Sequence, residues 1–402
     1  MVSSTGHGDA SLKRVHYQDG QYAVGSILAV VQPLDPERLS ARYLHAYLST
    51  FKDELLVSRM VGTANVSLTV AKISGVPIPL IPISAQRKIE ALMALCDRLE
   101  ARQADADSAH AQLVQALLGS LTQACDAEDF AQSWQRLAEH FHILFTTESS
   151  IDALKQTLLQ LAVMGKLVPQ DPSDEPASEL LKRIAEEKAR LVAEGRLKKQ
   201  KPLCDIDEDE AFFELPSSWT WARFGNICAI KGELVRPEDF PSLRQVAPDC
   251  IEKGTGRLTD NRTVKDSGVK GPNSRFFAGQ IVYSKIRPSL SKAVLVDFDG
   301  LCSADMYPID AFISSEFLLK EILSEVFLEQ VRVAENRIKM PKLNQESLTN
   351  FVLPIPPLDE QHRIVAKVDQ LMALCDQLKA RLNQARQVHE QLANALVEQA
   401  VA

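Results

Sequence analysis

The chain has 402 residues, 45% of them hydrophobic and 24% charged, as in an ordinary globular protein of two or three domains. Its formal charge of −8 gives no global sign of nucleic-acid binding, although a local basic patch would still be one. The seven cysteines form no CxxC pair, which argues against a disulfide framework or zinc site and favours a reducing cytoplasm. No apolar run approaches about 18 residues, so a membrane span is not expected. Residues 1–9 lack an apolar signal core and are expected to be a loose tail.

The first 83 residues combine an apolar segment at 22–31, a helix at 41–56 and a proline-rich extended stretch that ends at Pro82. A long helix is then expected over 84–118, with a helical extension to residue 145. It contains the hexapeptide LMALCD at 92–97. Its apolar residues recur with the 4-3 spacing of a coiled-coil seam.

A helical connector is expected between residues 146 and 211. Helices are predicted at 130–145, 151–164 and 178–194, with a break at Gly165 and a turn at 171–176. The linker at 195–211 is first basic and then acidic. We interpret these opposite charge blocks as solvated, with partner docking as the alternative.

Residues 212–358 are expected to form one complete α+β domain. Short apolar runs among glycines and turns predict strands at 224–231, 280–286 and 292–297. A helix at 314–334 is expected to follow them.

The hexapeptide LMALCD occurs a second time at 371–376, within a second long helix expected over 359–402. A proline-rich stretch and a glutamine precede both copies, Gln86 in one and Gln361 in the other. Residues 43–82 align without gaps with the second copy at an offset of 275, which rises to 279 at the hexapeptide. This period is too long for a solenoid and predicts a domain-plus-helix unit that occurs twice.

The obvious partner for each long helix is the other one, packed side by side. At about 1.5 Å per residue, residues 364–399 would span roughly 50 Å, more than a DNA turn of about 34 Å. The predicted seam consists of Leu92, Cys96, Leu99, Leu113, Leu117, Ile364, Val368, Leu371, Cys375, Leu378, Leu382, Leu392 and Leu396.

No catalytic or metal-binding motif is found in the sequence. There is no phosphate-binding glycine loop of either common type and no tetrapeptide of the kind with which amino-methyltransferases hold adenine. His140 and His142 lie two residues apart on a predicted helix and would not share a face. Asp249, Glu252 and Lys253 lack the spacing of a nuclease carboxylate set. We therefore predict neither catalytic residues nor metal ligands.

A basic stretch stands out in the complete domain. Residues 253–292 hold nine basic side chains against two acidic ones, among glycines that would let the backbone approach a phosphate. We favour DNA binding over an ordinary solvated loop surface, with Arg and Lys as phosphate and guanine contacts. The candidate DNA-binding residues are Lys253, Arg257, Arg262, Lys265, Lys270, Arg275, Lys285, Arg287, Lys292, Arg337, Lys339 and Lys342.

Three long motifs resemble the specificity subunits of type I restriction-modification enzymes. Residues 151–191 (IDALKQTLLQLAVMGKLVPQDPSDEPASELLKRIAEEKARL) are similar to the family's central conserved region. Residues 214–227 (ELPSSWTWARFGNI) and 353–364 (LPIPPLDEQHRI) are similar to the opening and closing motifs of a target-recognition domain. The resemblance extends from about residue 22 to the end.

The resemblance implies an α+β fold in which target-recognition domains are linked by two long antiparallel coiled-coil helices in a pseudo-twofold arrangement. It implies a non-catalytic subunit that recognises a bipartite double-stranded DNA target and holds methyltransferase and restriction/translocase subunits. The helices at 84–118 and 359–400 would dock the methyltransferase. S-adenosylmethionine, ATP and Mg are expected on those partner subunits, with no cofactor on this chain.

The first copy departs from the family pattern, because only some 60 residues precede its proline turn where the second copy has about 145. We expect a truncated first recognition domain, from a shortened gene product or completed by another chain. Two other functions stay open: a coiled-coil protein that never contacts nucleic acid, and a free-standing modification enzyme. DNA binding with the methyltransferase present and S-adenosylmethionine binding by the chain alone would distinguish them.

Overall fold

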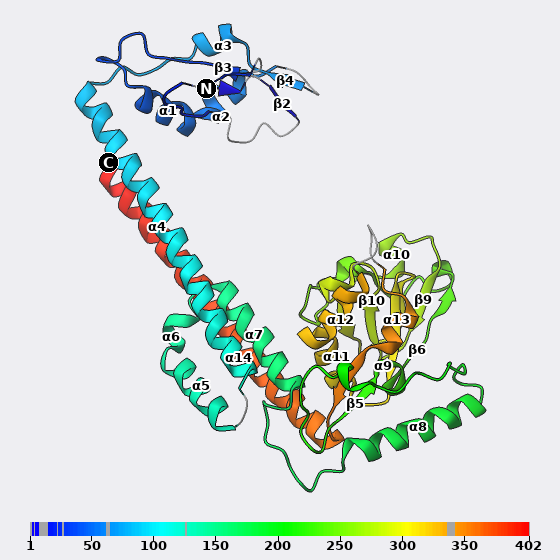
Figure 1. Cartoon of the computed structure of the whole chain (residues 1–402). Coiled ribbons are helices and arrows are strands. Elements are labelled where there is room, and N and C mark those ends of the chain that lie inside the picture. The colour runs from blue at the N-terminus through cyan, green and yellow to red at the C-terminus, as the bar shows by residue number, and fades with distance from the viewer. Residues whose placement is uncertain are drawn as a thin grey trace. The chain divides into compact units, whose positions relative to one another are not determined.

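The computed structural model describes residues 2–3, 5–7, 15–21, 23–25, 28–61, 65–124, 127–335 and 342–401. These residues form two compact units, unit 1 (1–110) and unit 2 (111–402), whose elements are shown in Figure 1. Helices, sheets and two long helices are all present, which confirms the expected α+β class. The finer division at residues 83, 145, 211 and 358 stays a prediction.

Unit 1 is built from short strands and short helices. The single helix expected at 41–56 is instead divided at Phe51, where the backbone leaves helical geometry (φ −102°, ψ 23°). The core consists of Leu44, Leu48, Leu56, Leu68 and Val76. The elements are β1 (Val2–Ser3), β2 (Thr5–His7), β3 (Leu28–Ala29), α1 (Ala41–Thr50), α2 (Lys52–Leu55), η1 (Val57–Arg59), β4 (Asn65–Ser67) and α3 (Val70–Ser74), with β1 paired to β3 and β2 to β4.

Gln86 fixes the point where this unit meets its long helix. The side chain is fully buried. Its Oε1 accepts a hydrogen bond from the Ser40 backbone N–H at 2.8 Å, and its Nε2 donates to the carbonyls of Arg38 and Ile81, each at 2.8 Å. Ser40 is also the N-cap of α1, so one amide holds the start of α1 against the proline-rich stretch.

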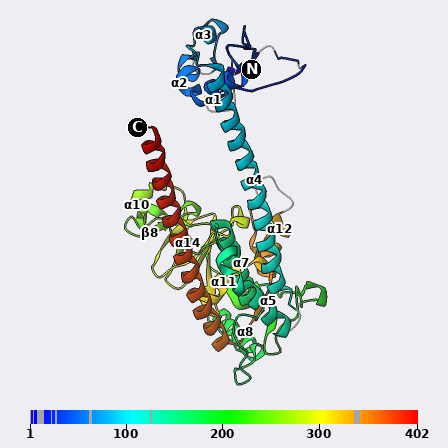
Figure 2. The same ribbon diagram turned by 90° about the vertical axis from the view of Figure 1, so that its left-hand side faces the viewer.

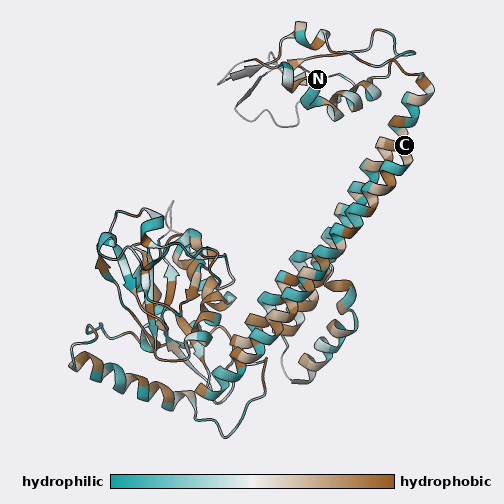
Figure 3. Ribbon diagram, turned by 180° about the vertical axis from the view of Figure 1, so that it is seen from behind, coloured by the Kyte–Doolittle hydropathy of each residue, from teal (hydrophilic) through white to brown (hydrophobic). Residues whose placement is uncertain are grey.

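The first long helix, α4 (Ile83–Thr122), continues from unit 1 into unit 2. It contains no proline and a single glycine near its end, so nothing in the sequence interrupts it. Every residue from 91 to 109 is exposed. Apolar positions, brown in Figure 3, recur along this helix among hydrophilic ones.

Unit 2 continues with helices that precede its sheets (Figure 2). The helix expected at 130–145 is divided at His140, which has non-helical φ and ψ. Thr147 and Ser150 form a capping box at the start of the next helix. The elements are α5 (Ala127–Glu139), α6 (Phe141–Leu144), α7 (Glu148–Val163), α8 (Ala177–Ala193) and η2 (Glu208–Glu210).

The chain turns after α7 at Gly165, which has φ +71°. A Cβ at this position would lie 2.6 Å from Pro216 Cγ and 3.2 Å from Trp219 Cζ2. Only glycine permits both this conformation and this close approach. Gly165 therefore brings the end of α7 against the opening of the sheet domain.

Two four-stranded sheets form the body of the domain, in the orders β11-β10-β13-β6 and β7-β9-β12-β8, while β14 pairs with β5. The strands expected near 280–286 and 292–297 are confirmed by β10 and β11. The strand expected at 224–231 is wrong in its first half, because Phe224 N–H bonds to Phe351 O and the helical turn α9 follows. The elements are β5 (Thr220–Arg223), α9 (Phe224–Ile227), β6 (Cys228–Ile230), β7 (Glu233–Val235), η3 (Pro237–Asp239), β8 (Arg244–Val246), η4 (Pro248–Cys250), α10 (Val264–Ser267), β9 (Asn273–Phe276), β10 (Ile281–Ser284), η5 (Pro288–Leu290), β11 (Ala293–Leu295), β12 (Gly300–Ser303), β13 (Met306–Ala311) and β14 (Val352–Ile355).

Helices α11 (Ser315–Leu323), α12 (Glu325–Glu335) and α13 (Gln345–Asn350) complete the domain. The single helix expected at 314–334 is broken at Ser324, whose hydroxyl accepts from Phe327 N–H at 3.4 Å and starts α12. The aromatic rings of Phe224, Tyr283 and Phe351 surround Phe327 in the core.

Gln361 joins this domain to the second long helix, α14 (Leu358–Val401), as Gln86 joins unit 1 to α4. Its Oε1 accepts from Ser314 N–H at 2.9 Å and its Nε2 donates to Pro356 O at 3.0 Å. The duplication is thus present in the fold. The N-caps Ser40 and Ser314 are offset by 274 residues, one fewer than the 275 that separate Gln86 from Gln361.

Candidate nucleic-acid interface

One edge of the sheet domain collects the ends of strands from both four-stranded sheets. Ser303, at the end of β12, lies opposite Asn273 at the start of β9, and Asn273 also lies opposite Val235 at the end of β7. β8 runs parallel to β12 and ends beside it. In the other sheet β10 ends at Ser284, opposite Met306 at the start of β13. The short β12–β13 turn therefore links both sheets at this edge.

Loops from distant parts of the sequence meet there. Gly254 N–H bonds to Ser291 O at 3.3 Å, and Leu343 N–H bonds to Lys285 O at 2.9 Å. Lys342 forms a bridge with Ile286. The strand ends and these bonds bring together seven cations, which we call the basic edge: Arg236, Lys253, Lys270, Lys285, Arg287, Lys292 and Lys342.

Three lysines of the basic edge hold its loops together. Lys285 Nζ donates to Ala304 O at 2.6 Å, and Lys292 Nζ donates to Pro248 O at 2.5 Å. Lys342 Nζ lies 3.0 Å from the Asp305 carboxylate, which is 4.0 Å from Lys285 Nζ. These lysines hold the loops of the basic edge in place, and Asp305 offsets part of the charge of Lys285 and Lys342.

The other four cations of the basic edge are exposed. Within the described part of the chain, neither an ion pair nor a side-chain hydrogen bond engages Arg236, Lys253, Lys270 or Arg287. Nearby acids are engaged: Glu335 Oε1 accepts from Ser289 N–H at 3.0 Å, and Glu252 Oε2 accepts from Thr255 at 3.0 Å. The four cations are therefore available to an anionic ligand.

Arg287 sits on an unusual turn. Arg287 and Ser291, on either side of η5, both have φ +46°, a left-handed conformation that costs a non-glycine residue about 1–2 kcal/mol. Such strain persists where surrounding bonds hold it and clusters at binding sites. Here the bonds are those of Ser291 O to Gly254 and of Ser289 N–H to Glu335.

Four of the predicted DNA-binding residues lie away from the basic edge or are committed elsewhere. Arg257 pairs with Asp376 of α14 at 2.5 Å. Arg262 pairs with Asp249 at 2.9 Å and holds the pKa of that carboxyl below its usual range. Arg275 lies between the rings of Phe240 and Phe277, 5.3 and 4.9 Å from their centroids.

The fourth, Lys265, lies on α10 beside the start of β8, at the opposite end of the sheet; its backbone N–H bonds to Pro241 O. Two further candidates, Arg337 and Lys339, lie outside the described residues. Arg236 was missed, because it lies outside the basic stretch. It reaches the edge only through the pairing of Val235 with Asn273, which no sequence pattern announces.

The predicted seam divides into three groups. Ile364 and Val368 are buried in the core cluster of the sheet domain, which also contains residues of α7 and α8. Leu371, Cys375, Leu378, Leu382 and Leu117 belong to a cluster formed with α7. Leu92, Leu99, Leu113, Leu392 and Leu396 are each more than half exposed, and Cys96 is exposed.

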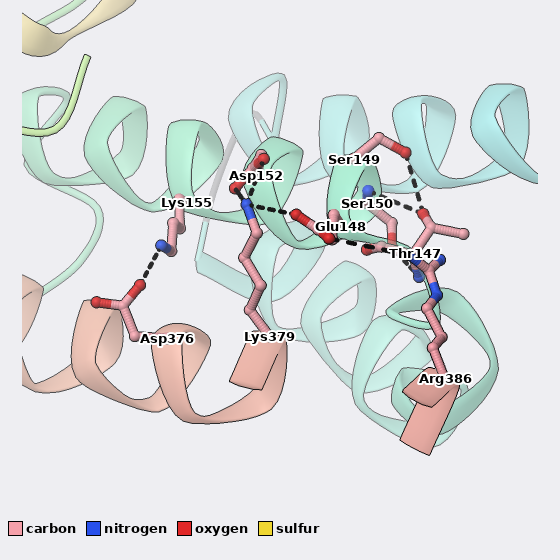
Figure 4. Close-up of polar contacts among 9 residues, drawn as sticks. All are labelled: Thr147, Glu148, Ser149, Ser150, Asp152, Lys155, Asp376, Lys379 and Arg386. Atoms are coloured by element: carbon pink, nitrogen blue, oxygen red, sulfur yellow. Dashed lines mark hydrogen bonds and ion pairs between the residues drawn. The ribbon is translucent and has the colours of Figure 1, made fainter. Parts of the chain in front are cut away.

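Ion pairs join α7 to α14 beside that cluster (Figure 4). Lys379 Nζ lies 3.1 Å from both Glu148 and Asp152, and Arg386 lies 3.9 Å from Glu148. Lys155 of α7 pairs with Asp376, which Arg257 also contacts. Burial alone would raise the pKa of Asp376, but the hydrogen bonds from Lys155 and Arg257 outweigh it and lower that pKa.

Among the described residues, no three His, Cys, Asp or Glu side chains are placed to share a metal ion. None of the helices in the described ranges is both long and apolar enough to cross a membrane. The arrangement offers charge, a rigid edge and exposed donors, which are means of binding.

Comparison with known proteins finds similarity to DNA specificity subunits of restriction enzymes. Residues 247–386 match the family model "Type I restriction modification DNA specificity domain". The chain is 40% identical over 342 residues to the EcoAI specificity subunit of Escherichia coli and 37% identical over 351 residues to the EcoEI specificity subunit of the same organism. Each match covers 81% of this chain and 58% of the relative, so the chain spans just over half the length of these relatives.

A solved structure from a study of complex assembly and conformational transition in the type I R-M system is similar in fold. The TM-score is 0.52 at 16% identity, covering 90% of this chain and 71% of that one. The family match includes the loops at 251–258 and 285–292 and most of the basic edge, but not Arg236.

Proposed function

Because the chain belongs to the family of type I restriction-modification specificity subunits, we propose that unit 2 reads double-stranded DNA with its basic edge. The observation that carries the proposal is the meeting of four exposed, unengaged cations where the strand ends of two sheets converge. Phosphate contacts would set the position on the duplex, and base contacts would set the sequence.

The geometry favours a duplex over a small anion. Arg236 follows β7 and Lys270 precedes β9, and these two strands pair within one sheet. Lys253 and Arg287 come from loops at the edge where the second sheet joins the first. Cations spread along an edge can follow a line of phosphates, and Arg287 on its fixed turn suits the two acceptors of guanine in the major groove.

We further propose that unit 2 reads one half of a bipartite target. A second recognition element, in unit 1 or in another chain, would read the other half. The long helices, α4 and α14, would act as spacers and dock methyltransferase subunits, with a restriction/translocase subunit added to the complex. The chain itself would be non-catalytic, with S-adenosylmethionine, ATP and Mg bound by those partners.

The test compares two quadruple variants of equal charge change. Arg236→Ala, Lys253→Ala, Lys270→Ala and Arg287→Ala together remove the free cations of the basic edge. Lys182→Ala, Arg183→Ala, Arg190→Ala and Arg196→Ala remove four exposed cations that are paired with glutamates along α8 and its end. Binding to a pool of random duplexes is measured by fluorescence anisotropy across a salt series, with the methyltransferase subunit present.

The edge variant should bind more weakly on all sequences, and its salt slope should flatten by about 0.9 for each phosphate that it no longer neutralises. The α8 variant should keep the affinity and slope of the unchanged chain. Equal affinities for the unchanged chain and the edge variant would rule out the basic edge as the DNA-binding surface.

A further inference from the structure

The turn that carries Arg287 has a backbone conformation that its own sequence disfavours. Arg287 has φ +46° and ψ +56°, and Ser291 at the other end of the turn has φ +46° and ψ +49°. Residues other than glycine rarely adopt this left-handed conformation. Pro288 adds to the conflict, because a proline favours extended backbone at the residue before it. The conformation of the turn therefore depends on bonds from elsewhere in the chain.

Two hydrogen bonds reach residues 287–291 from other segments that the structure describes. Gly254 N–H donates to Ser291 O at 3.3 Å, and Ser289 N–H donates to Glu335 Oε1 at 3.0 Å. The Ser291 hydroxyl adds no third bond, since it is buried without a partner among the described residues. The turn is thus held by one backbone group and one carboxylate.

The bond to Glu335 is the stronger of the two, because it is shorter and its acceptor is a carboxylate. Glu335 comes four residues after Val331 and eight after Phe327, so it stands on the same face of α12. Val331 is fully buried, and the Phe327 ring packs against the ring of Tyr283 in β10, with 5.8 Å between the centroids. That face of α12 is therefore fixed against the strand that leads into the turn.

The two opposite charges at this turn are used in different ways. Glu335 bonds to the main chain, whereas Arg287 is exposed and makes no ion pair with any described residue. An ion pair with Glu335 would have neutralised the arginine and held its side chain back from a ligand. The observed arrangement fixes the backbone and leaves the guanidinium available.

We propose that Glu335 is a positioning residue of the DNA site: by holding Ser289 N–H it keeps the turn left-handed and aims Arg287 at the bases of the duplex. This inference rests on the proposed function and adds to it a residue that does not itself contact DNA. Loss of Glu335 should relax the base preference that depends on Arg287. The phosphate contacts of the other exposed cations of the basic edge should be unchanged.

The test exposes the full chain, with the methyltransferase subunit present, to a pool of random duplexes and sequences the bound fraction. Arg287→Ala should lower discrimination at one base pair about tenfold, as expected for one bidentate contact to guanine. Glu335→Ala should lower discrimination at the same base pair by at least about threefold. The double variant should lose no more than Arg287→Ala alone, because Glu335 acts through Arg287.

Two further variants separate the hydrogen bond from the charge. Glu335→Gln keeps an acceptor oxygen and should retain most of the base preference. Glu329→Ala removes the same charge from an exposed position of α12 and should leave the preference unchanged. Equal losses in Glu335→Ala and Glu335→Gln would show an effect of charge and overturn the positioning role.

Hydrogen exchange of the chain without DNA distinguishes failure of this inference from failure of the proposed function. Glu335→Ala should speed exchange at residues 287–291, whereas Glu335→Gln and Glu329→Ala should not. Unchanged exchange in Glu335→Ala, a loss of preference at a different base pair, or a further loss in the double variant would overturn the role of Glu335 alone. Faster exchange in Glu335→Ala, together with no change of any base preference in Arg287→Ala, would overturn reading by Arg287 and the positioning role with it.

Discussion

Gln86 and Gln361 share two corresponding hydrogen bonds in the two copies of the repeated unit, and Gln86 makes a third to Arg38 O. The helices that follow them are covered differently. Each amide accepts from the N–H of an N-cap serine and donates to a carbonyl of the preceding extended stretch. Leu92 and Leu99 in α4 are exposed, while Leu371 and Cys375 in α14 pack against α7. We call the hydrogen bonds of each glutamine a joint between its domain and its long helix. The shared part of the joint is the same in both copies because it depends on local bonds, whereas α14 is covered because α7 packs against it.

The second joint has an addition that the first lacks. Glu360 accepts from Trp219 Nε1 at 3.0 Å and from Gln170 at 2.7 Å, and burial raises its pKa. At the 275-residue offset unit 1 has Ala85 in its place. Glu360 thus also ties the start of α14 to the connector, whereas the bonds of Gln86 join the start of α4 to Arg38, Ser40 and Ile81 of unit 1.

The largest expected effect on stability comes from replacing Gln361 and Gln86, one at a time, with leucine. Gln361→Leu would leave Ser314 N–H and Pro356 O buried without partners, at about 1–3 kcal/mol each. Gln86→Leu should have an effect of similar size but confined to unit 1. Hydrogen exchange of the full chain, with Gln135→Leu on the exposed face of α5 as control, separates the two. Loss of protection in unit 2 on changing Gln86 would contradict two independent joints.

The next effect concerns Glu321 of α11, which is fully buried; the corresponding position of α1, by the serine caps, is Tyr47. Both Glu321 carboxylate oxygens lack a hydrogen-bond partner within the described residues, and burial raises its pKa well above the usual value. Since the folded pKa is raised, its stabilising contribution is complete below about pH 4.3 and is lost as the pH rises.

Glu321→Leu should therefore raise the free energy of unfolding at pH 7 by about 1–3 kcal/mol. The gain should shrink toward pH 4, where the glutamate of the unfolded chain is protonated as well. Urea unfolding between pH 4 and pH 8 measures both. A gain that does not vary with pH would mean that Glu321 is not the titrating group.

The smallest effect comes from the charges between α7 and α14. Lys379→Glu should cost about 0.2–1 kcal/mol at low salt, because Lys379, Glu148 and Asp152 are all partly exposed. The matched change Glu100→Lys in α4 should leave the stability of the free chain unchanged within about 0.5 kcal/mol. Urea unfolding at low and high salt tests the pair, and a cost that persists at high salt would show a packing effect instead.

The long helices were predictable from the sequence almost to their ends, since α4 and α14 carry a regular apolar period without internal breakers. The shorter helices were predicted as single elements and are divided at Phe51, His140 and Ser324. Those breaks depend on local backbone geometry and on a serine hydroxyl, which apolar periodicity does not report.

The candidate interface was predictable only in composition. The basic stretch contains Lys253, Lys270 and Arg287, which are exposed at the edge. It could not show that Arg257 is held by Asp376, because the two lie 119 residues apart. Nor could it include Arg236, which strand register brings to the edge. Burial and pairing, which distinguish a free cation from a structural one, are properties of the fold.

The two glutamine joints have a consequence for how such a chain can change. Within the described ranges, both amides bond only to main-chain atoms: the N–H groups of Ser40 and Ser314 and the carbonyls of Arg38, Ile81 and Pro356. A main-chain group is the same whatever side chain it carries, so the attached domain can diverge in sequence without loosening its hold on the helix. A different domain with the same turn and N-cap could therefore be attached to the same helix, because its main chain would offer the glutamine the same hydrogen-bond partners.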